Sequence, residues 1–193
     1  MSREVSTDPR FRLTGGRLCL DLVATLGRRH GDPIERLPDD MTLVDWLVAV
    51  RLLPPHVAVS VLPNQLEAVR DLREVTYRLV RATMAGAEFD EVDVTRLNKV
   101  AMQPDLAPRL SLDRTRQLTW GENDPVGAAL ATLARDAVGL LIEPQTSRIK
   151  ECERPDCSLL FFDDSQAGRR RWCSMDRCGN LVKIAGYRQR SHR

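Results

Sequence analysis

Residues 152–178 read CERPDCSLLFFDDSQAGRRRWCSMDRC, and this stretch decides how the C-terminal part of the chain folds. It holds four cysteines in two close pairs, with a hairpin-sized insert between the pairs. Thiolates bind zinc tetrahedrally, so two such pairs allow one ion to fasten both ends of the insert. The sequence therefore predicts one structural zinc ion, and its ligands are Cys152, Cys157, Cys173 and Cys178.

Two other chemistries also use clustered thiols. A catalytic zinc ion needs an open position for water, and four thiolates leave none. A redox switch needs thiols of lowered pKa, which the neighbouring arginines would provide. The remaining cysteine, Cys19, lies far away in an apolar run and is predicted to be a buried, inert thiol. We therefore favour structural zinc over both alternatives.

The chain divides into a body, residues 1–145, and a zinc module, residues 146–193. The body is predicted to be a mostly helical α+β domain with a few short strands, and the module a small zinc finger. Within the module, residues 159–162 are typical of a strand, 163–168 of a turn and 169–173 of a returning strand. A piece of about 40 residues needs a metal or a similar staple because its own core is too small.

Hydropathy patterns predict the elements of the body. Thr42 begins a helix, and Asp45 three residues later completes a capping box. Alternation predicts a short strand within residues 10–18 and a hairpin around residues 113–115, whereas residues 27–40 are expected to be a loop. The helices predicted from apolar periodicity cover residues 18–26, 42–53, 63–85, 90–102 and 125–142.

Composition and motifs narrow the class of protein. Hydrophobic residues make up 42% and charged residues 29% of the chain, which is ordinary globular usage. The N-terminus has no apolar signal segment and the apolar stretch near residues 43–50 contains Asp45, so we expect no membrane span and a cytoplasmic location. His30, His56 and His192 are scattered, and common catalytic motifs are absent from the sequence, so we expect no enzyme.

Positive charge is concentrated at the C-terminus. From Gly168 onward the chain has eight basic residues and one acid, although the whole chain has a net charge of only +2. A helix starting near Arg177 would place polar side chains on one face and Leu181, Ile184 and Ala185 on a packing face. Such polar groups contact phosphates and base edges, which makes DNA the expected partner. The predicted contacts are Arg169, Arg170, Arg171, Arg177, Asn180, Lys183, Tyr187, Arg188 and Arg190.

The same charges have two other readings. The arginines could solvate a small module or dock on the slightly acidic body, as charge runs usually do. The finger could also be a zinc-stabilised module that binds another protein and no nucleic acid. A mobility-shift test on random duplex at low salt separates the DNA-binding protein from this competitor.

Asp21 is a carboxylate inside the apolar run of residues 18–26. Buried aspartate is rare unless it is paired, so an internal partner such as an arginine or a backbone group is the ordinary expectation. The functional alternative is that Asp21 lines a pocket for a small effector, whose binding alters how the body presents the finger.

Two groups of residues resemble known families. Trp172-Cys-Ser-Met175 and Cys178-Gly-Asn180, with two phenylalanines and three arginines upstream, resemble the CGNR zinc finger. Gly15-Gly16-x-Leu18-Cys-Leu-Asp21 and Leu43-x-x-Trp46-Leu47 resemble the ABATE domain that accompanies this finger in predicted stress-induced transcription regulators of bacteria.

The resemblance to these families implies a treble-clef finger that contacts DNA and an N-terminal domain that senses a small ligand. One finger alone makes a small DNA footprint, so a homodimer would be physically sensible. This chain departs at one position from the Cys-Gly-Asn-Arg motif that gives the finger its name, because Leu181 stands where the family carries arginine.

Overall fold

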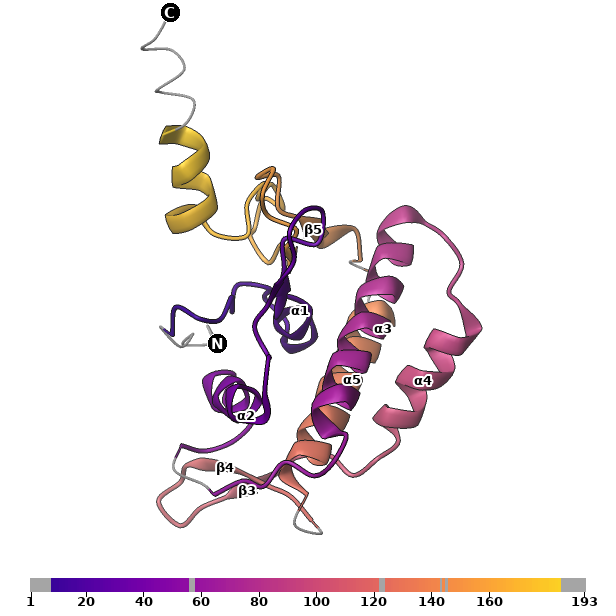
Figure 1. Cartoon of the computed structure of the whole chain (residues 1–193), viewed down its shortest axis with the longest axis vertical. Coiled ribbons are helices and arrows are strands. Elements are labelled where there is room, and N and C mark those ends of the chain that lie inside the picture. Colours follow the sequence, from indigo (N-terminus) through magenta and orange to yellow (C-terminus); the bar gives the residue numbers. More distant parts are fainter. Residues whose placement is uncertain (1–7, 56–57, 122–123, 143, 145, 185–193) are drawn as a thin grey trace, which may run out of the picture.

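The computed structural model describes residues 8–55, 58–121, 124–142, 144 and 146–184. In Figure 1 the helices of the body form one group, with a β-hairpin at one end and the zinc module at the other. The architecture is α+β, and it consists mainly of helices with a few two-stranded sheets. This confirms the predicted fold class.

Three long helices form the larger part of the body. α3 (Gln65–Ala85), α4 (Glu91–Ala101) and α5 (Pro125–Ile142) pack against one another, close to the bounds that periodicity predicted. α3 ends at Gly86, which has the positive φ of +63° that glycine adopts without strain. α4 begins after Asp90, whose side chain accepts a hydrogen bond from the Asp93 amide at 3.1 Å.

α5 is both long and apolar. Its 18 residues have a mean hydropathy of 1.4, so by length and composition it could cross a membrane, a property that was not expected from the sequence. However, 56% of the helix is buried inside the protein, where it contacts α1, α3 and α4. The core of the body accounts for this apolar composition.

The N-terminal segment differs from its prediction. α1 (Leu18–Val23) is the expected buried helix, but no strand forms in residues 10–18. Instead, β1 (Leu26–Gly27) and β2 (Ile34–Glu35) form a short antiparallel hairpin. Leu26 was predicted to end the helix, and the rest of the hairpin lies in the segment that was expected to be a loop. Strands of two residues are too short to leave a recognisable alternation in the sequence.

α2 (Asp40–Ala49) starts one turn earlier than its predicted capping box. Asp39 is the N-cap, and its side chain accepts hydrogen bonds from the Thr42 amide at 2.8 Å and the Thr42 hydroxyl at 2.7 Å. Asp45 instead forms an ion pair with Arg10 at 2.8 Å. The prediction of Thr42 as the cap was therefore wrong, because the aspartate three residues before it takes that role.

The hairpin around residues 113–115 is confirmed. β3 (Ala107–Leu110) pairs with β4 (Arg116–Thr119) in antiparallel register, with Ala107 opposite Thr119. Asp113 accepts a hydrogen bond from the Thr115 amide at 3.1 Å, which stabilises the turn.

The zinc module contains one small sheet. After the short 3-10 helix η1 (Thr146–Arg148), β5 (Ile149–Glu151) pairs antiparallel with β6 (Leu160–Phe162). The predicted return strand at residues 169–173 was wrong, because β6 finds its partner upstream in β5. A single π-helical turn, η2 (Met175–Gly179), follows and continues as helix to residue 184.

Body and module share buried surface. Ile149 and Leu160 of the module belong to the hydrophobic core of the body, and Ala24 of the body packs with the cysteines of the module. Glu151 adds charged contacts, since Arg81 of α3 lies 2.6 Å and His30 lies 2.5 Å from its carboxylate. The module is therefore fastened to the body by its β5–β6 sheet.

Candidate metal centre

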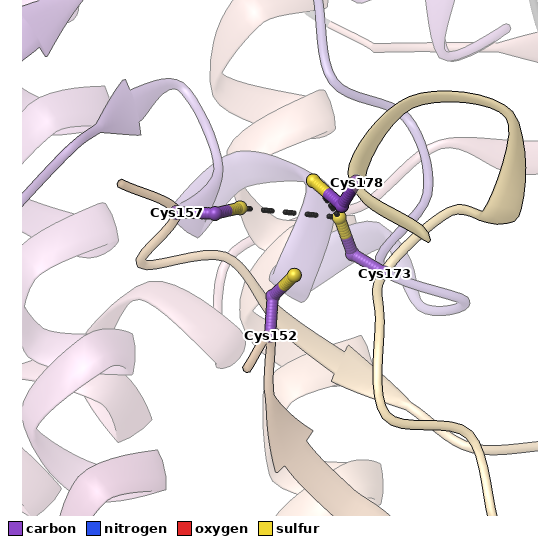
Figure 2. Close-up of side chains that lie close together, drawn as sticks. All are labelled: Cys152, Cys157, Cys173 and Cys178. Atoms are coloured by element: carbon purple, nitrogen blue, oxygen red, sulfur yellow. Dashed lines mark hydrogen bonds between the residues drawn. The ribbon is translucent and has the colours of Figure 1, made fainter. Parts of the chain in front are cut away.

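The four predicted cysteines meet at one point. Their sulfur atoms all lie within 4.8 Å of one another, and Cys173 Sγ lies 3.9 Å from Cys157 Sγ and 3.6 Å from Cys178 Sγ (Figure 2). Four thiolates about 2.3 Å from a central zinc ion lie about 3.8 Å apart at the corners of a tetrahedron. The geometry and the donor atoms therefore both fit zinc.

Local structure places each pair of cysteines. Cys152 directly follows β5 and donates its amide hydrogen to Leu159 O at 3.0 Å, while Cys157 closes a turn onto Arg154 O at 2.9 Å. Cys173 and Cys178 lie on either side of the start of η2. Three of the four are buried and Cys157 is half-buried, so little water reaches the sulfur atoms.

The thiols cannot all ionise without a cation among them. Hydrogen bonds from Cys157 and Cys173 lower the pKa of Cys152 to about 2. The Cys152 sulfur in turn raises the pKa of Cys157 to about 12 and also raises the pKa of Cys173. A bound zinc ion supplies the positive charge that lets coordinating thiols lose their protons.

One arginine next to the site compensates part of the negative charge of a tetrathiolate. Burial opposes the charge on Arg154, but a hydrogen bond to Cys178 leaves the pKa of Arg154 raised. With four sulfur ligands no coordination position remains for water, which is the arrangement of a structural site. The predicted structural zinc cofactor thus has a fitting site in this chain.

A buried carboxylate holds the loop between the two cysteine pairs. Asp163 is fully buried and accepts hydrogen bonds from Lys150 Nζ at 2.7 Å, Ser165 Oγ at 2.6 Å and the Arg170 amide at 2.8 Å. Burial alone would raise the pKa of Asp163, but these donors together lower it. The loop of residues 163–170 is therefore built around an ionised side chain; its first six residues were predicted as a turn, and residues 169–170 as the start of the returning strand.

The predicted DNA contacts fall into different environments. Arg170 lies over the Phe161 ring at 4.9 Å and donates hydrogen bonds to Asp164 and to Cys173 O, so its guanidinium serves the module itself. Arg171 forms an exposed ion pair with Glu153 at 2.6 Å. The side chains of Arg169, Arg177, Asn180 and Lys183 are exposed, and Tyr187, Arg188 and Arg190 lie outside the described residues.

The helix that contains η2 lies at the edge of the module. Figure 1 shows the helix that contains η2 beyond the β5–β6 sheet, on the far side from the long helices. Leu181 and Ile184 are 47% and 48% exposed, so the prediction that they pack inward was wrong for the described part of this helix. Ala185, the third member of that face, lies outside the described residues.

Asp21 has an internal partner. Its side chain is buried and accepts a hydrogen bond from the Gly15 amide at 2.9 Å. This bond shapes a loop whose Gly15 carbonyl accepts a hydrogen bond from the Phe162 amide at 2.8 Å, and Gly16 has a φ of +78° against the same strand. The glycine motif that carries the family resemblance thus contacts β6 of the module, and Asp21 does not line the cavity that lies between the N-terminal segment and the zinc module.

Folding brings together five arginines that were not predicted to form a group. A cavity of about 580 Å³ lies between the N-terminal segment of the body and the zinc module. No periodicity links these positions, so only the folded chain reveals the group. The arginines that line the cavity are Arg12, Arg28, Arg36, Arg154 and Arg177.

Comparison with known families agrees with this geometry. Residues 16–144 match the ABATE family, described as "Putative stress-induced transcription regulator", and residues 148–191 match the CGNR zinc finger. No curated protein matches the chain. The chain belongs to the ABATE family and carries a CGNR zinc finger after its ABATE domain.

Proposed function

We propose that this protein is a DNA-binding transcription regulator whose zinc module contacts DNA and whose body senses a small ligand. The observation that carries the proposal is the exposed positive charge on the zinc-held module. Arg169, Arg177 and Lys183 are exposed, and none of them forms an ion pair within the described part of the chain. Unpaired cations on a rigid support are suited to phosphates.

Two further groups can join this surface. Asn180 is exposed and can offer its amide to a base edge or a phosphate. Arg171 is held by Glu153, but both side chains are largely exposed, at 62% and 48%. Such a surface pair contributes little, about 0–1 kcal/mol, so a phosphate can replace the glutamate at small cost.

The proposal gives the protein no catalytic reaction, because a closed tetrathiolate leaves zinc no position for substrate. It places the protein in the cytoplasm of a cell that keeps these thiols reduced.

The test measures affinity for a random duplex as a function of salt. With about three phosphates neutralised, log K should fall with log salt at a slope near −2.7. Arg169→Glu combined with Lys183→Glu should weaken binding and make this slope shallower by about 1.8. The matched control is Arg109→Glu with Arg116→Glu, two exposed arginines on the β3–β4 hairpin, which should leave both quantities unchanged.

Zinc content is measured for every variant, because loss of metal would remove the surface indirectly. Equal affinity of the two double variants, each with zinc bound, would contradict the proposal.

A second function is favoured by one specific observation, the exposed apolar pair Leu181 and Ile184. Side chains of this kind are typical of a protein contact, here a second copy of the chain, which would also double the DNA footprint. Light scattering should then show a dimer that Leu181→Glu converts to a monomer. A monomeric wild type at tens of micromolar would remove this second function.

A further inference from the structure

The cavity between body and module has a small net positive charge: four arginines outside ion pairs outweigh one free carboxylate and the charge of about −2 of the zinc tetrathiolate, three of whose ligands line the cavity. Among its lining residues, Asp8 is paired with Arg10 and Asp156 with Arg154. This leaves a single lining acid, Asp176, for the other arginines of the cavity. Those four arginines are Arg12, Arg28, Arg36 and Arg177, and none has an ion pair with a described residue.

Arg36 is the least satisfied of them. It is half-buried, and its Nε is buried with no hydrogen-bond partner among the described residues. Gly27 leaves room for the guanidinium, since a Cβ there would lie 3.0 Å from Arg36 Nη2. Burial, and then the positive charges of Arg12 and Arg177, lower the pKa of Arg36, although Cys157 and Glu35 offset part of this shift. A desolvated cation that faces other cations is costly unless an anion joins them.

Much of the remaining lining is apolar, beside a few hydroxyl side chains and three of the zinc ligands. Phe11, Leu13, Leu26, Ile34 and Leu159 form part of the wall. The volume of about 580 Å³ lies within the range of small-molecule pockets, about 300–1,000 Å³, and is far larger than a simple inorganic ion needs. The cavity therefore combines a cationic group with space for an organic part.

We propose that this cavity binds a small phosphate monoester with an apolar or aromatic part, held by Arg12, Arg36 and Arg177. A phosphate monoester brings a charge of about −1.5 to −2, which balances the unpaired cations better than one carboxylate would. The guanidinium fork matches phosphate oxygens in bidentate geometry. The apolar wall then covers the remainder of the ligand.

The site joins the two parts of the protein. Arg12 and Arg36 come from the body, whereas Arg177 belongs to η2 and precedes the zinc ligand Cys178. A ligand that contacts both parts favours the arrangement in which they are close, so its binding is coupled to the orientation of the module. Only this coupling to DNA rests on the proposed function; binding of the anion does not.

The test uses the zinc-loaded full chain and three probes at constant ionic strength: phenyl phosphate, inorganic phosphate and phenol. Calorimetry should show phenyl phosphate binding about tenfold more tightly than inorganic phosphate, because its ring buries apolar surface, and phenol should not bind measurably. Arg36→Gln should weaken phenyl phosphate by at least about tenfold, as expected for loss of one charge-assisted contact. Arg109→Gln, an exposed arginine outside the cavity, is the matched control.

Arg12→Gln provides a second variant in case Arg36→Gln disturbs folding, and zinc content and circular dichroism are recorded for both. Unchanged phenyl phosphate affinity in a folded Arg12→Gln or Arg36→Gln protein would overturn the proposal. A random-duplex titration distinguishes the source of the phosphate. Retained DNA affinity in Arg36→Gln supports a small-molecule site, whereas parallel loss of DNA and phenyl phosphate binding would assign these arginines to the DNA surface and overturn it.

Discussion

Different interactions stabilise the body and the zinc module. The body buries a large apolar cluster that draws on every one of its described helices, with Trp46, Leu79 and Leu140 almost fully out of contact with water. Among the described residues, the buried cluster around the zinc site has six members: five belong to the module, Ala24 belongs to the body, and three are the cysteines Cys152, Cys173 and Cys178. Half of the residues in that small core are therefore zinc ligands. We infer that the module depends on zinc for its stability, whereas the body is stabilised by hydrophobic burial.

The largest effect is expected from loss of zinc, which should unfold the module and leave the body folded. Removing zinc with a chelator, or Cys173→Ser, should unfold the module while the long helices of the body remain, because structural zinc contributes roughly 10–16 kcal/mol of apparent binding free energy. Hydrogen exchange resolved by segment is the measurement. We expect protection to be lost in β5, β6 and η2 and kept in α3 and α5.

The control is Cys19→Ser, which replaces the buried cysteine of α1 and should leave zinc content at one ion per chain. If η2 remained protected from hydrogen exchange after complete zinc removal, the module would not depend on zinc for its stability, and the prediction would be wrong.

The zinc ligands could be predicted from the sequence because they are local. Two cysteine pairs, each closed by a turn of a few residues, specify a metal site without knowledge of the rest of the chain. The partner of β6 could not be predicted, since the choice between β5 and the arginine-rich segment at residues 169–173 depends on the loop folded around Asp163. The grouping of the cavity arginines could not be predicted either, although Arg177 was predicted as a DNA contact, because Arg12, Arg36 and Arg177 meet only after the module packs on the body.

Asp163→Asn tests whether the buried carboxylate of Asp163 supports the zinc site of the module. The substitution keeps the shape of the side chain but removes the charge that Lys150 and the Arg170 amide contact. Because folding of the module and zinc binding are coupled, zinc affinity should fall by about 10–100-fold, the range seen for residues that support metal ligands. Competition with a chromophoric chelator measures this change.

Asp164→Asn is the matched control for Asp163→Asn, because the Asp164 side chain is the next carboxylate in the sequence and is 75% exposed. Its zinc affinity should stay within about twofold of wild type, the size expected for a surface ion pair. Equal losses in the two variants would mean that the buried charge has no special role.

Asp93 provides the corresponding test in the body. Its carboxylate is 7% exposed and accepts hydrogen bonds from Arg78 at 2.6 and 2.7 Å, and this bonding lowers the pKa of Asp93 although burial opposes the shift. Asp93→Asn should destabilise the body by about 2 kcal/mol, as expected for a charge-assisted hydrogen bond. Zinc affinity should not change, because the effect is confined to α3 and α4.

The contribution of Asp93 should depend on pH in a definite direction. A carboxyl with a lowered pKa stabilises the fold fully above its unfolded value of about 4, and this stability is lost as pH falls through the folded value. The difference in melting temperature between wild type and Asp93→Asn should therefore be constant from pH 8 to pH 5 and shrink below about pH 4. Chelator is present throughout, so that the protein is free of zinc at every pH. The control is Asp71→Asn, at an exposed position on α3, whose melting temperature should equal that of the wild type at each pH.

The fold of the body was predictable where elements are long, and less so where they are short. The bounds of α3, α4 and α5 follow from repeated apolar positions and from terminal residues such as Asp90 and Gly86. The β1–β2 hairpin and the Asp39 cap escaped prediction because a two-residue strand and a single side chain leave little pattern. The role of Asp21 depended on a partner, the Gly15 amide, that only the folded loop supplies.

The smallest expected effect concerns the contact between the two parts. Gly16 has a φ of +78°, and a Cβ there would lie 3.1 Å from Phe162 O. Gly16→Ala should therefore cost about 1–2 kcal/mol, through backbone strain and the close approach to β6. Because neither core is altered, zinc affinity and the protection of α5 should stay unchanged while amide exchange at Phe162 accelerates. Gly31→Ala, at a glycine whose added Cβ meets nothing within 4 Å, is the control, and equal exchange at Phe162 in both variants would mean that the glycine loop does not fasten the module to the body.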